Sequence, residues 1–174
     1  MHYPRFKSVT TMKISTLAVL DGEGFKALAA LDKKLVDKYG DSFSNQAWDS
    51  DNFAYPLPSK YDLSHLLYYN EHLAGYCIAS EKHGAVYIHR FAVERLEEGL
   101  AGKFFSRVLE YYDRPVHLMV NTQNRPAIDF YAGFGFDIAE DSDAIRDFVA
   151  PELEIEGPEI IIEKDYRCYL MRKD

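Results

Sequence analysis

The chain has 174 residues, of which 47% are hydrophobic and 14% aromatic, so we expect one folded domain over residues 1–174. Its net charge of −8 argues against nucleic acid as a partner, because phosphate contacts need clustered Lys and Arg. No apolar run reaches the ~18 residues of a membrane span, and Met1–Lys7 lacks the apolar core of a signal peptide. The two cysteines, Cys77 and Cys168, indicate a reducing compartment, so we expect a cytoplasmic protein.

The N-terminal part of the chain predicts a strand and then a helix. Residues 9–20 form an apolar run that is typical of a strand, and Asp21–Gly24 interrupts it. Apolar residues then recur at helical spacing over residues 25–40, where a glycine ends the pattern. Residues 42–62 carry no regular period, so we expect an irregular segment that contains the only tryptophan, Trp48.

Three strands are expected next, over residues 63–69, 73–81 and 85–93. The first two are separated by Asn70-Glu71-His72, which is typical of a hairpin turn, and Lys82-His83-Gly84 separates the second from the third. Such short connections predict that the three strands form an antiparallel meander.

The second half alternates helix and strand. From Gly99 to Tyr112 the apolar residues fall on one helical face, and residues 116–120 read as a short buried strand. Asn124 is a good N-cap for another helix, which Gly133 ends.

The tail predicts two last strands, near residues 136–140 and 160–172. Between them residues 141–158 form an acidic stretch that is longer than a hairpin turn. The sequence leaves open whether this stretch packs on the body of the domain, on a partner or on a substrate.

Two blocks of sequence carry a resemblance to a known family. The first is Phe91-Ala92-Val93 followed by Gly99-Leu100-Ala101, and the second consists of Asn124, Ala127, Phe130, Tyr131, Gly135 and Phe136. In this order they resemble the signature of the GNAT superfamily of N-acetyltransferases, over about residues 60–138. The basic residue that the family places three positions before its first glycine falls on Leu96, and Arg95 stands one place earlier.

The resemblance implies an α+β, three-layer fold, the acyl-CoA N-acyltransferase (GNAT) fold. Its sheet is mixed but mostly antiparallel, is split by the cofactor, and carries helices on both faces. The implied activity is transfer of an acetyl group from acetyl-CoA, as co-substrate, to an amine of a small molecule or peptide. Neither Cys77 nor Cys168 has the surroundings of a nucleophile, which favours direct attack by the amine.

The glycine-rich turn is the candidate phosphate clamp, because small residues and a helix N-terminus suit an anion. The same pattern also fits a plain strand-to-helix turn, and residues 85–93 also fit a simple buried strand. The residues that the resemblance assigns to the cofactor are Phe91, Ala92, Val93, Arg95, Gly99, Leu100, Ala101, Gly102, Lys103 and Asn124.

Three residues are candidates for proton transfer. His89 lies two residues before Phe91, so we expect it on the same strand face, with Arg90 on the opposite face, and it is the first candidate for general base. Glu81 is the second. Tyr131 is the candidate general acid, because a neutral phenol can protonate a leaving thiolate. The alternatives are a structural strand histidine for His89, a solvated carboxylate for Glu81 and a core aromatic for Tyr131.

The histidines and cysteines show no metal-ligand spacing, so we expect no metal. The excess of acidic residues favours a cationic acceptor. The sequence leaves open whether the chain forms a homodimer. The rival hypothesis is a non-catalytic module on the same fold, either an acyl-CoA sensor or a protein-interaction surface over residues 141–158. Leu96 and the paired Glu97 and Glu98 favour that rival, whereas Tyr131 favours an enzyme.

Overall fold

The computed structural model describes residues 10–40, 46–164 and 166–174. The helices are α1 (Gly22–Tyr39), α2 (Ser50–Ala54), α3 (Lys60–Leu63), α4 (Leu100–Tyr111), α5 (Arg125–Gly133) and α6 (Ser142–Phe148), with a 3₁₀ turn, η1, at Leu17–Val19. The strands are β1 (Met12–Thr16), β2 (His65–Tyr69), β3 (His72–Lys82), β4 (Ala85–Val93), β5 (Val116–Asn121), β6 (Asp137–Ile138), β7 (Glu154–Glu156), β8 (Ile160–Glu163) and β9 (Tyr166–Lys173). Within these described residues, none of the helices combines the length and apolar character needed to cross a bilayer.

The strands form one sheet in the order β1-β2-β3-β4-β5-β9-β8-β7, and β6 pairs with β9. Every pairing is antiparallel except that of β4 with β5, which is parallel. The expected mixed, mostly antiparallel sheet is therefore confirmed. The parallel pair is also the shortest contact in the middle of the sheet, since it joins only Val86–Ile88 to Val116–Leu118.

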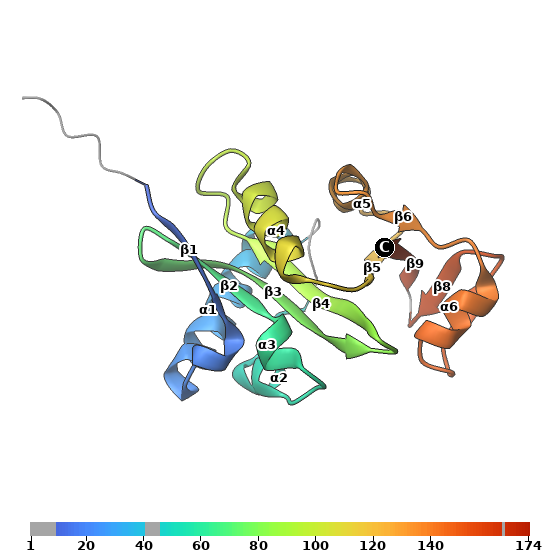
Figure 1. Cartoon of the computed structure of the whole chain (residues 1–174), viewed down its shortest axis with the longest axis horizontal. Helices are drawn as coiled ribbons and strands as arrows, with labels where there is room; N and C mark the ends of the chain where they lie inside the picture. The colour runs from blue at the N-terminus through green and yellow to red at the C-terminus, as the bar shows by residue number, and fades with distance from the viewer. Residues whose placement is uncertain (1–9, 41–45, 165) are drawn as a thin grey trace, which may run out of the picture.

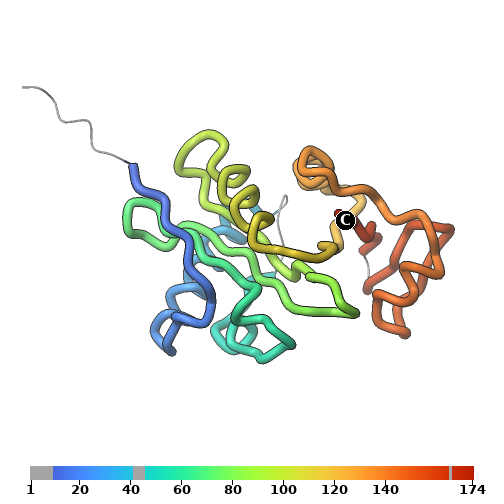
Figure 2. Tube along the Cα trace, in the orientation of Figure 1, coloured from blue at the N-terminus to red at the C-terminus, as the bar shows by residue number. Residues whose placement is uncertain are grey.

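Helices cover both faces of this sheet, as expected (Figure 1). On one face α4 and α5 enclose the largest core cluster, in which Phe104 and Phe105 are fully buried. On the other face α1 and α2 pack against β2, β3 and β4, with Leu28, Leu35 and Phe53 at the centre of a second cluster. The trace in Figure 2 shows the N-terminal and C-terminal elements at opposite ends of the sheet, so its middle joins the two parts.

Two expectations for the N-terminal part need correction. The first strand spans Met12–Thr16 and not residues 9–20, because η1 follows it directly; residue 9 lies outside the described residues. Residues 46–62 hold the two short helices α2 and α3 and are not irregular, and residues 42–45 lie outside the described residues. The helix α2 begins with a capping box, in which Asp49 and Asn52 each accept a hydrogen bond from the backbone N–H of the other, at 2.8 and 3.0 Å.

The tail is more structured than its sequence indicates. Residues 141–158 contain α6 and β7, and the region expected as one strand over residues 160–172 is the pair β8 and β9. Ile145 and Phe148 of α6 are buried against Ala85 and Leu170 of the sheet. The acidic stretch therefore packs on the body of the domain.

Candidate active site

A β-bulge at His89 organises the middle of β4. In the pairing with β3, Arg90 lies opposite Ile78 and Ile88 lies opposite Ala79, so His89 is an extra residue. An extra residue shifts the alternation of side chains by one place. His89 and Arg90 consequently both turn to the face of α1, and the next residue returns to the face of α4.

Side-chain contacts confirm this shift. Arg90 forms an ion pair with Asp32 of α1, whereas Phe91 packs against Phe104 and Phe105 of α4, with ring centroids 5.9 and 5.0 Å away. The prediction that His89 shares a face with Phe91 and opposes Arg90 is therefore wrong. It assumed an unbroken strand with a period of two, and the bulge breaks that period.

Beyond the bulge, β4 separates from β5. Pairing between them ends at Ile88 and Leu118 in the part of the chain that the structure describes. The N–H of Glu94 donates to Ala74 of β3 at 2.7 Å. Because N–H groups point alternately to the two sides of a strand, those of Phe91 and Val93 point away from β3 and toward the opening.

Two cavities lie along this opening. The first, of about 160 Å³, is lined by Ile88, His89, Arg90, Phe91, Leu118, Met119, Val120, Asn121, Asn124, Ala127 and Tyr131. The second, of about 210 Å³, is lined by Leu35, Tyr39, Phe91, Ala92, Val93, Arg95, Ala101, Pro126, Ala127, Phe130 and Tyr131. Phe91, Ala127 and Tyr131 belong to both, so the cavities meet at these three side chains.

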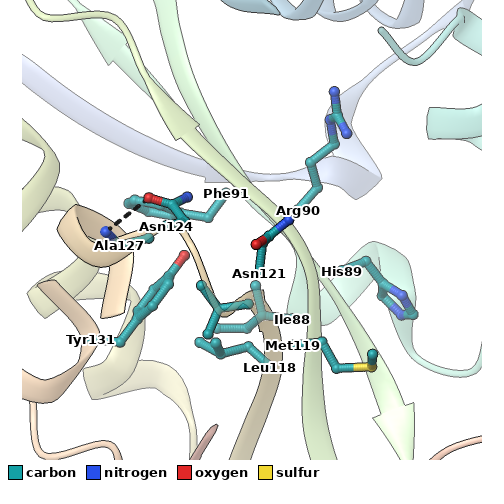
Figure 3. A pocket seen from close by; sticks show the side chains of 11 residues that line it. Ile88, His89, Arg90, Phe91, Leu118, Met119, Asn121, Asn124, Ala127 and Tyr131 are labelled. Atoms are coloured by element: carbon teal, nitrogen blue, oxygen red, sulfur yellow. Dashed lines mark hydrogen bonds between the residues drawn. The ribbon is translucent and has the colours of Figure 1, made fainter. Parts of the chain in front are cut away.

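Tyr131 lies at that junction. Its ring packs against Phe105, Phe130 and Phe136, with centroids 5.4–5.9 Å away. Figure 3 shows its hydroxyl pointing into the space between α5 and β4, on the side of Asn121 and Asn124. Burial, and secondarily the nearby Cys77, raise the pKa of the Tyr131 hydroxyl, so the group is neutral and can donate a proton at neutral pH.

The start of α5 is fixed as its sequence predicts. The Asn124 side chain accepts a hydrogen bond from the N–H of Ala127 at 3.2 Å, which is the dashed contact in Figure 3, and Pro126 stands in the first turn. This cap orients α5 so that Ala127 and Tyr131, one turn apart, both face the cavities.

The turn before α4 has the backbone that the glycine pattern predicts. Gly99 adopts a left-handed conformation with φ of +76°, and no described side chain caps the N-terminus of α4. The Arg95 guanidinium lies 4.2 Å from the Tyr39 ring centroid and lines the second cavity. Leu96 instead points outward and is 44% exposed, so Arg95 is the basic residue of this turn that reaches the opening.

The predicted cofactor residues fall into two groups. Phe91, Ala92, Val93, Arg95, Ala101 and Asn124 line the cavities. Gly99, Leu100, Gly102 and Lys103 are not among the residues that line them. Leu100 is buried in the core below α4, and the Lys103 ammonium lies 3.0 Å from the Glu97 carboxylate.

The two candidates for general base differ in position. His89 lines the first cavity, but its ring lies on the far side of β4 from Tyr131 (Figure 3). There its Nε2 is 2.6 Å from the hydroxyl of Ser80. Burial, together with the charges of Lys60 and Lys82, lowers the pKa of His89 to about 4. Its imidazole is therefore neutral at pH 7 and a weak base.

Glu81 lies elsewhere. It pairs with Val86 near the closed end of the β4–β5 seam, and its carboxylate is 3.5 Å from Arg114 and 3.3 Å from the Ser59 hydroxyl. It is absent from the linings of both cavities.

Several lining residues were missed by sequence reasoning. Leu35 and Tyr39 come from α1, and Met119 and Asn121 come from the end of β5. The helical pattern of α1 and the apolar run of β5 mark these residues as core or turn positions, and only the separation of β4 from β5 brings them to the opening. No group of His, Cys, Asp and Glu among residues 10–40, 46–164 and 166–174 could hold a metal ion.

Among the described strands, the sheet opens at the parallel pairing of β4 with β5, beside a helix whose N-cap is a glycine, and this arrangement defines an acyl-CoA N-acyltransferase fold. The acetyltransferase (GNAT) family matches residues 29–136, which is more than half of the chain. The chain therefore belongs to the GNAT family and is an acetyltransferase. A comparison with curated protein sequences found no significant match.

Solved structures with the same fold include three acetyltransferases of low sequence identity. PaiA N-acetyltransferase from Thermoplasma acidophilum, in complex with coenzyme A, has a TM-score of 0.64 at 12% identity, over 94% of this chain and 98% of that one. The ribosomal-protein-S18-alanine N-acetyltransferase from Escherichia coli has a TM-score of 0.60 at 16% identity, over 93% and 92%. Diaminobutyrate acetyltransferase EctA from Paenibacillus lautus, in complex with L-2,4-diaminobutyric acid and coenzyme A, has a TM-score of 0.60 at 10% identity, over 94% and 95%.

Proposed function

We propose that this chain transfers an acetyl group from acetyl-CoA to an amine of a small molecule or peptide, by direct attack of the amine on the thioester. The observation that carries the proposal is the junction of the two cavities at Tyr131, beside the unpaired edge of β4. One cavity would hold the end of the cofactor arm and the other would admit the amine, so that the two substrates meet at one hydroxyl.

The turn before α4 fits the pyrophosphate of coenzyme A. A Cβ added at Gly99 would meet nothing within 4 Å, so the backbone there is open to a ligand. The N-terminus of α4 supplies N–H groups and a positive dipole end, and Arg95 adds a positive charge at the second cavity. In this proposal Gly99–Lys103 bind the phosphates through their backbone, and Phe91, Ala92 and Val93 contact the pantetheine arm.

The developing charge on the acyl oxygen needs a donor. The N–H of Phe91 points toward the opening and is held in a strand, so it is preorganised for this role. One such donor is worth ~3–4 kcal/mol of activation free energy in acyl transfer.

The leaving thiolate needs a proton, and we assign that donation to Tyr131. Its hydroxyl lies at the junction of the cavities, and its raised pKa keeps it protonated at neutral pH. The conjugate acid of a thiolate has a pKa near ~8.5, so transfer becomes favourable only as the thiolate forms and is desolvated.

His89 is the better placed of the two base candidates, because it lines the first cavity and Glu81 lines neither. With a pKa of about 4, His89 cannot take a proton from a charged amine efficiently at neutral pH. We therefore expect the amine to enter the site neutral. Because the His89 ring lies across β4 from Tyr131, His89 would take up the proton after attack by relay through water.

The acceptor is an amine of a polypeptide or of a small molecule. Among proteins of this fold, one is named for the alanine of ribosomal protein S18 and another was solved with L-2,4-diaminobutyric acid. Both the amine of a polypeptide and that of a small molecule are thus compatible with this architecture. The net charge of −8 favours a cationic acceptor through long-range attraction.

The test is release of free thiol from acetyl-CoA with a panel of amines that includes polyamines, diamino acids and short peptides. Acetylated product should form in equal amount with any amine that supports release. A protein that binds acetyl-CoA but releases no thiol with any amine would overturn the proposal.

A further inference from the structure

The bulge in β4 is held from the face opposite the cavities. We infer that Asp32 and Arg90 are a positioning pair that sets the direction of the Phe91 N–H. The inference rests on the proposed function, in which that N–H binds the acyl oxygen. It concerns two side chains that lie on the α1 face of β4 and act through its backbone.

The pair has a fixed geometry. Arg90 Nε lies 2.7 Å from one carboxylate oxygen of Asp32, and Arg90 Nη2 lies 2.9 Å from the other. The side chain of Asp32 is fully buried and that of Arg90 is 7% exposed. A planar guanidinium that binds a carboxylate through two parallel hydrogen bonds has little freedom to rotate, so the backbone of Arg90 is held as well.

Asp32 is itself anchored by other groups. It accepts hydrogen bonds from the Tyr76 hydroxyl on β3 and from the N–H of Trp48, the latter at 2.8 Å. Arg90 also donates to the backbone carbonyl of Gln46 at 2.9 Å. A buried charge is tolerated when all its hydrogen bonds are made, and here the network joins α1, β3, β4 and the segment before α2.

The residues on either side of Arg90 are held in opposite directions. The His89 ring is bound to Ser80, on the same face as Arg90, whereas the Phe91 ring stacks on Phe130 on the other face, with centroids 5.7 Å apart. The peptide between Arg90 and Phe91 therefore sits between two anchors. A shift of the bulge by one residue would reverse these directions and turn the Phe91 N–H away from the opening.

The test uses a double variant, Asp32→Asn with Arg90→Met. A single substitution would leave one buried charge unpaired, and its effect on folding would mask its effect on turnover. The double variant removes both charges, and the Asn can still accept a hydrogen bond from Trp48 or Tyr76. The matched control is Tyr61→Phe, which removes another tyrosine hydroxyl on the α1 face of the sheet, one that donates to the Ala54 carbonyl and not to Asp32.

We expect the double variant to fold and to keep the thermal shift produced by coenzyme A, which has no acyl oxygen. Its KM for acetyl-CoA should stay within about twofold, while kcat falls by ~10²-fold, the loss typical of a small misplacement of a catalytic group. The loss should be equal with two amines of different size, since the acyl oxygen is common to both. Tyr61→Phe should keep kcat.

Three results would overturn the inference. The first is an unchanged kcat in the double variant. The second is a loss confined to the KM of one amine, which would make the pair a wall of the acceptor site. The third is an equal fall of kcat in Tyr61→Phe. Absence of turnover in the unmodified protein would instead contradict the proposed function itself.

Discussion

Phe91 of β4 and Phe130 of α5 stack with ring centroids 5.7 Å apart and an angle of 27° between their planes. This contact links the strand that carries the bulge to the helix that carries Tyr131. Both residues line the second cavity, so the same pair of rings forms part of its wall. The position of the Tyr131 hydroxyl relative to the β4 backbone therefore depends on aromatic packing.

Tyr131→Phe should preserve this packing and lower kcat, because only the proton donor is lost. We expect a fall of ~10²–10⁴ in kcat where thiolate departure limits the rate, with the affinity for acetyl-CoA nearly unchanged. The loss should shrink with a thioester whose leaving thiol is more acidic. Steady-state kinetics with both thioesters would measure this.

The control is Tyr112→Phe, which removes another buried hydroxyl, bound to the Leu63 carbonyl at 2.7 Å and outside both cavities. Full activity of Tyr131→Phe on acetyl-CoA would make Tyr131 a core aromatic and water the proton source.

Gly99→Glu should abolish the stabilisation that acetyl-CoA gives. Saturating ligand adds ~2.7 kcal/mol to the free energy of unfolding at a hundredfold excess over Kd, and a carboxylate at Gly99 would repel the phosphates. Thermal unfolding with and without acetyl-CoA measures the shift. Gly84→Glu is the control, because Gly84 has a similar φ of +73° and lies in the β3–β4 turn. An equal shift in both variants would locate the phosphates elsewhere.

His89→Gln tests the base. If His89 accepts the proton, turnover should fall by ~10²–10⁴ and the acidic limb of the pH–rate profile, expected near the pKa of about 4, should disappear. The profile should be recorded with two amines of different pKa. A limb whose midpoint shifts with the pKa of the amine reports titration of the acceptor and not of His89. A variant with the original rate and lower stability would give His89 a structural role only.

The free energy of unfolding should fall as the pH drops from about 6.5 toward 4. Burial lowers the pKa of both His89 and His117 from 6.5 to about 4, so over this range the unfolded chain binds protons that the native state does not. Each histidine should contribute roughly 1–3 kcal/mol to the loss. Urea unfolding at several pH values measures this loss. The free energy of unfolding should depend less steeply on pH in the double variant His89→Gln with His117→Gln than in the original protein. An identical slope would mean that neither group stays neutral in the native state.

Phe105→Ala should cost ~3–5 kcal/mol of stability, because Phe105 is fully buried and its ring contacts those of five neighbours on β4, α5 and the segment after α5. Tyr111→Ala on the same helix is the control, since that side chain is 65% exposed, and should cost less than ~1 kcal/mol. Urea denaturation at constant pH compares the two, and equal losses would contradict the packing argument.

Local signals predicted the parts of the fold that are set by nearby residues. The helix α5 begins and ends as expected, with Asn124 and Pro126 at its start and Gly133 at its end. Capping and termination act within one helical turn, so they can be read from nearby residues. The Asp49–Asn52 capping box was present in the sequence but hidden among loop-forming residues, so α2 was missed.

The bulge could not be predicted in this way. It is held by contacts of Arg90 with Asp32, 58 residues away, and of His89 with Ser80 on the neighbouring strand β3. The family motif located the cavities at Phe91, Asn124 and Tyr131, whereas the face of His89 followed from tertiary contacts alone.

The pairing of β9 has a consequence for how the chain folds during synthesis. β9 pairs with β5, β6 and β8, and all three emerge from the ribosome before it does. Until β9 is made, β5 has only its three pairs with β4, and the apolar residues beneath α6 lack their partners Cys168 and Leu170. Until β9 is made, the nascent C-terminal part therefore has exposed strand edges, which can pair with other chains.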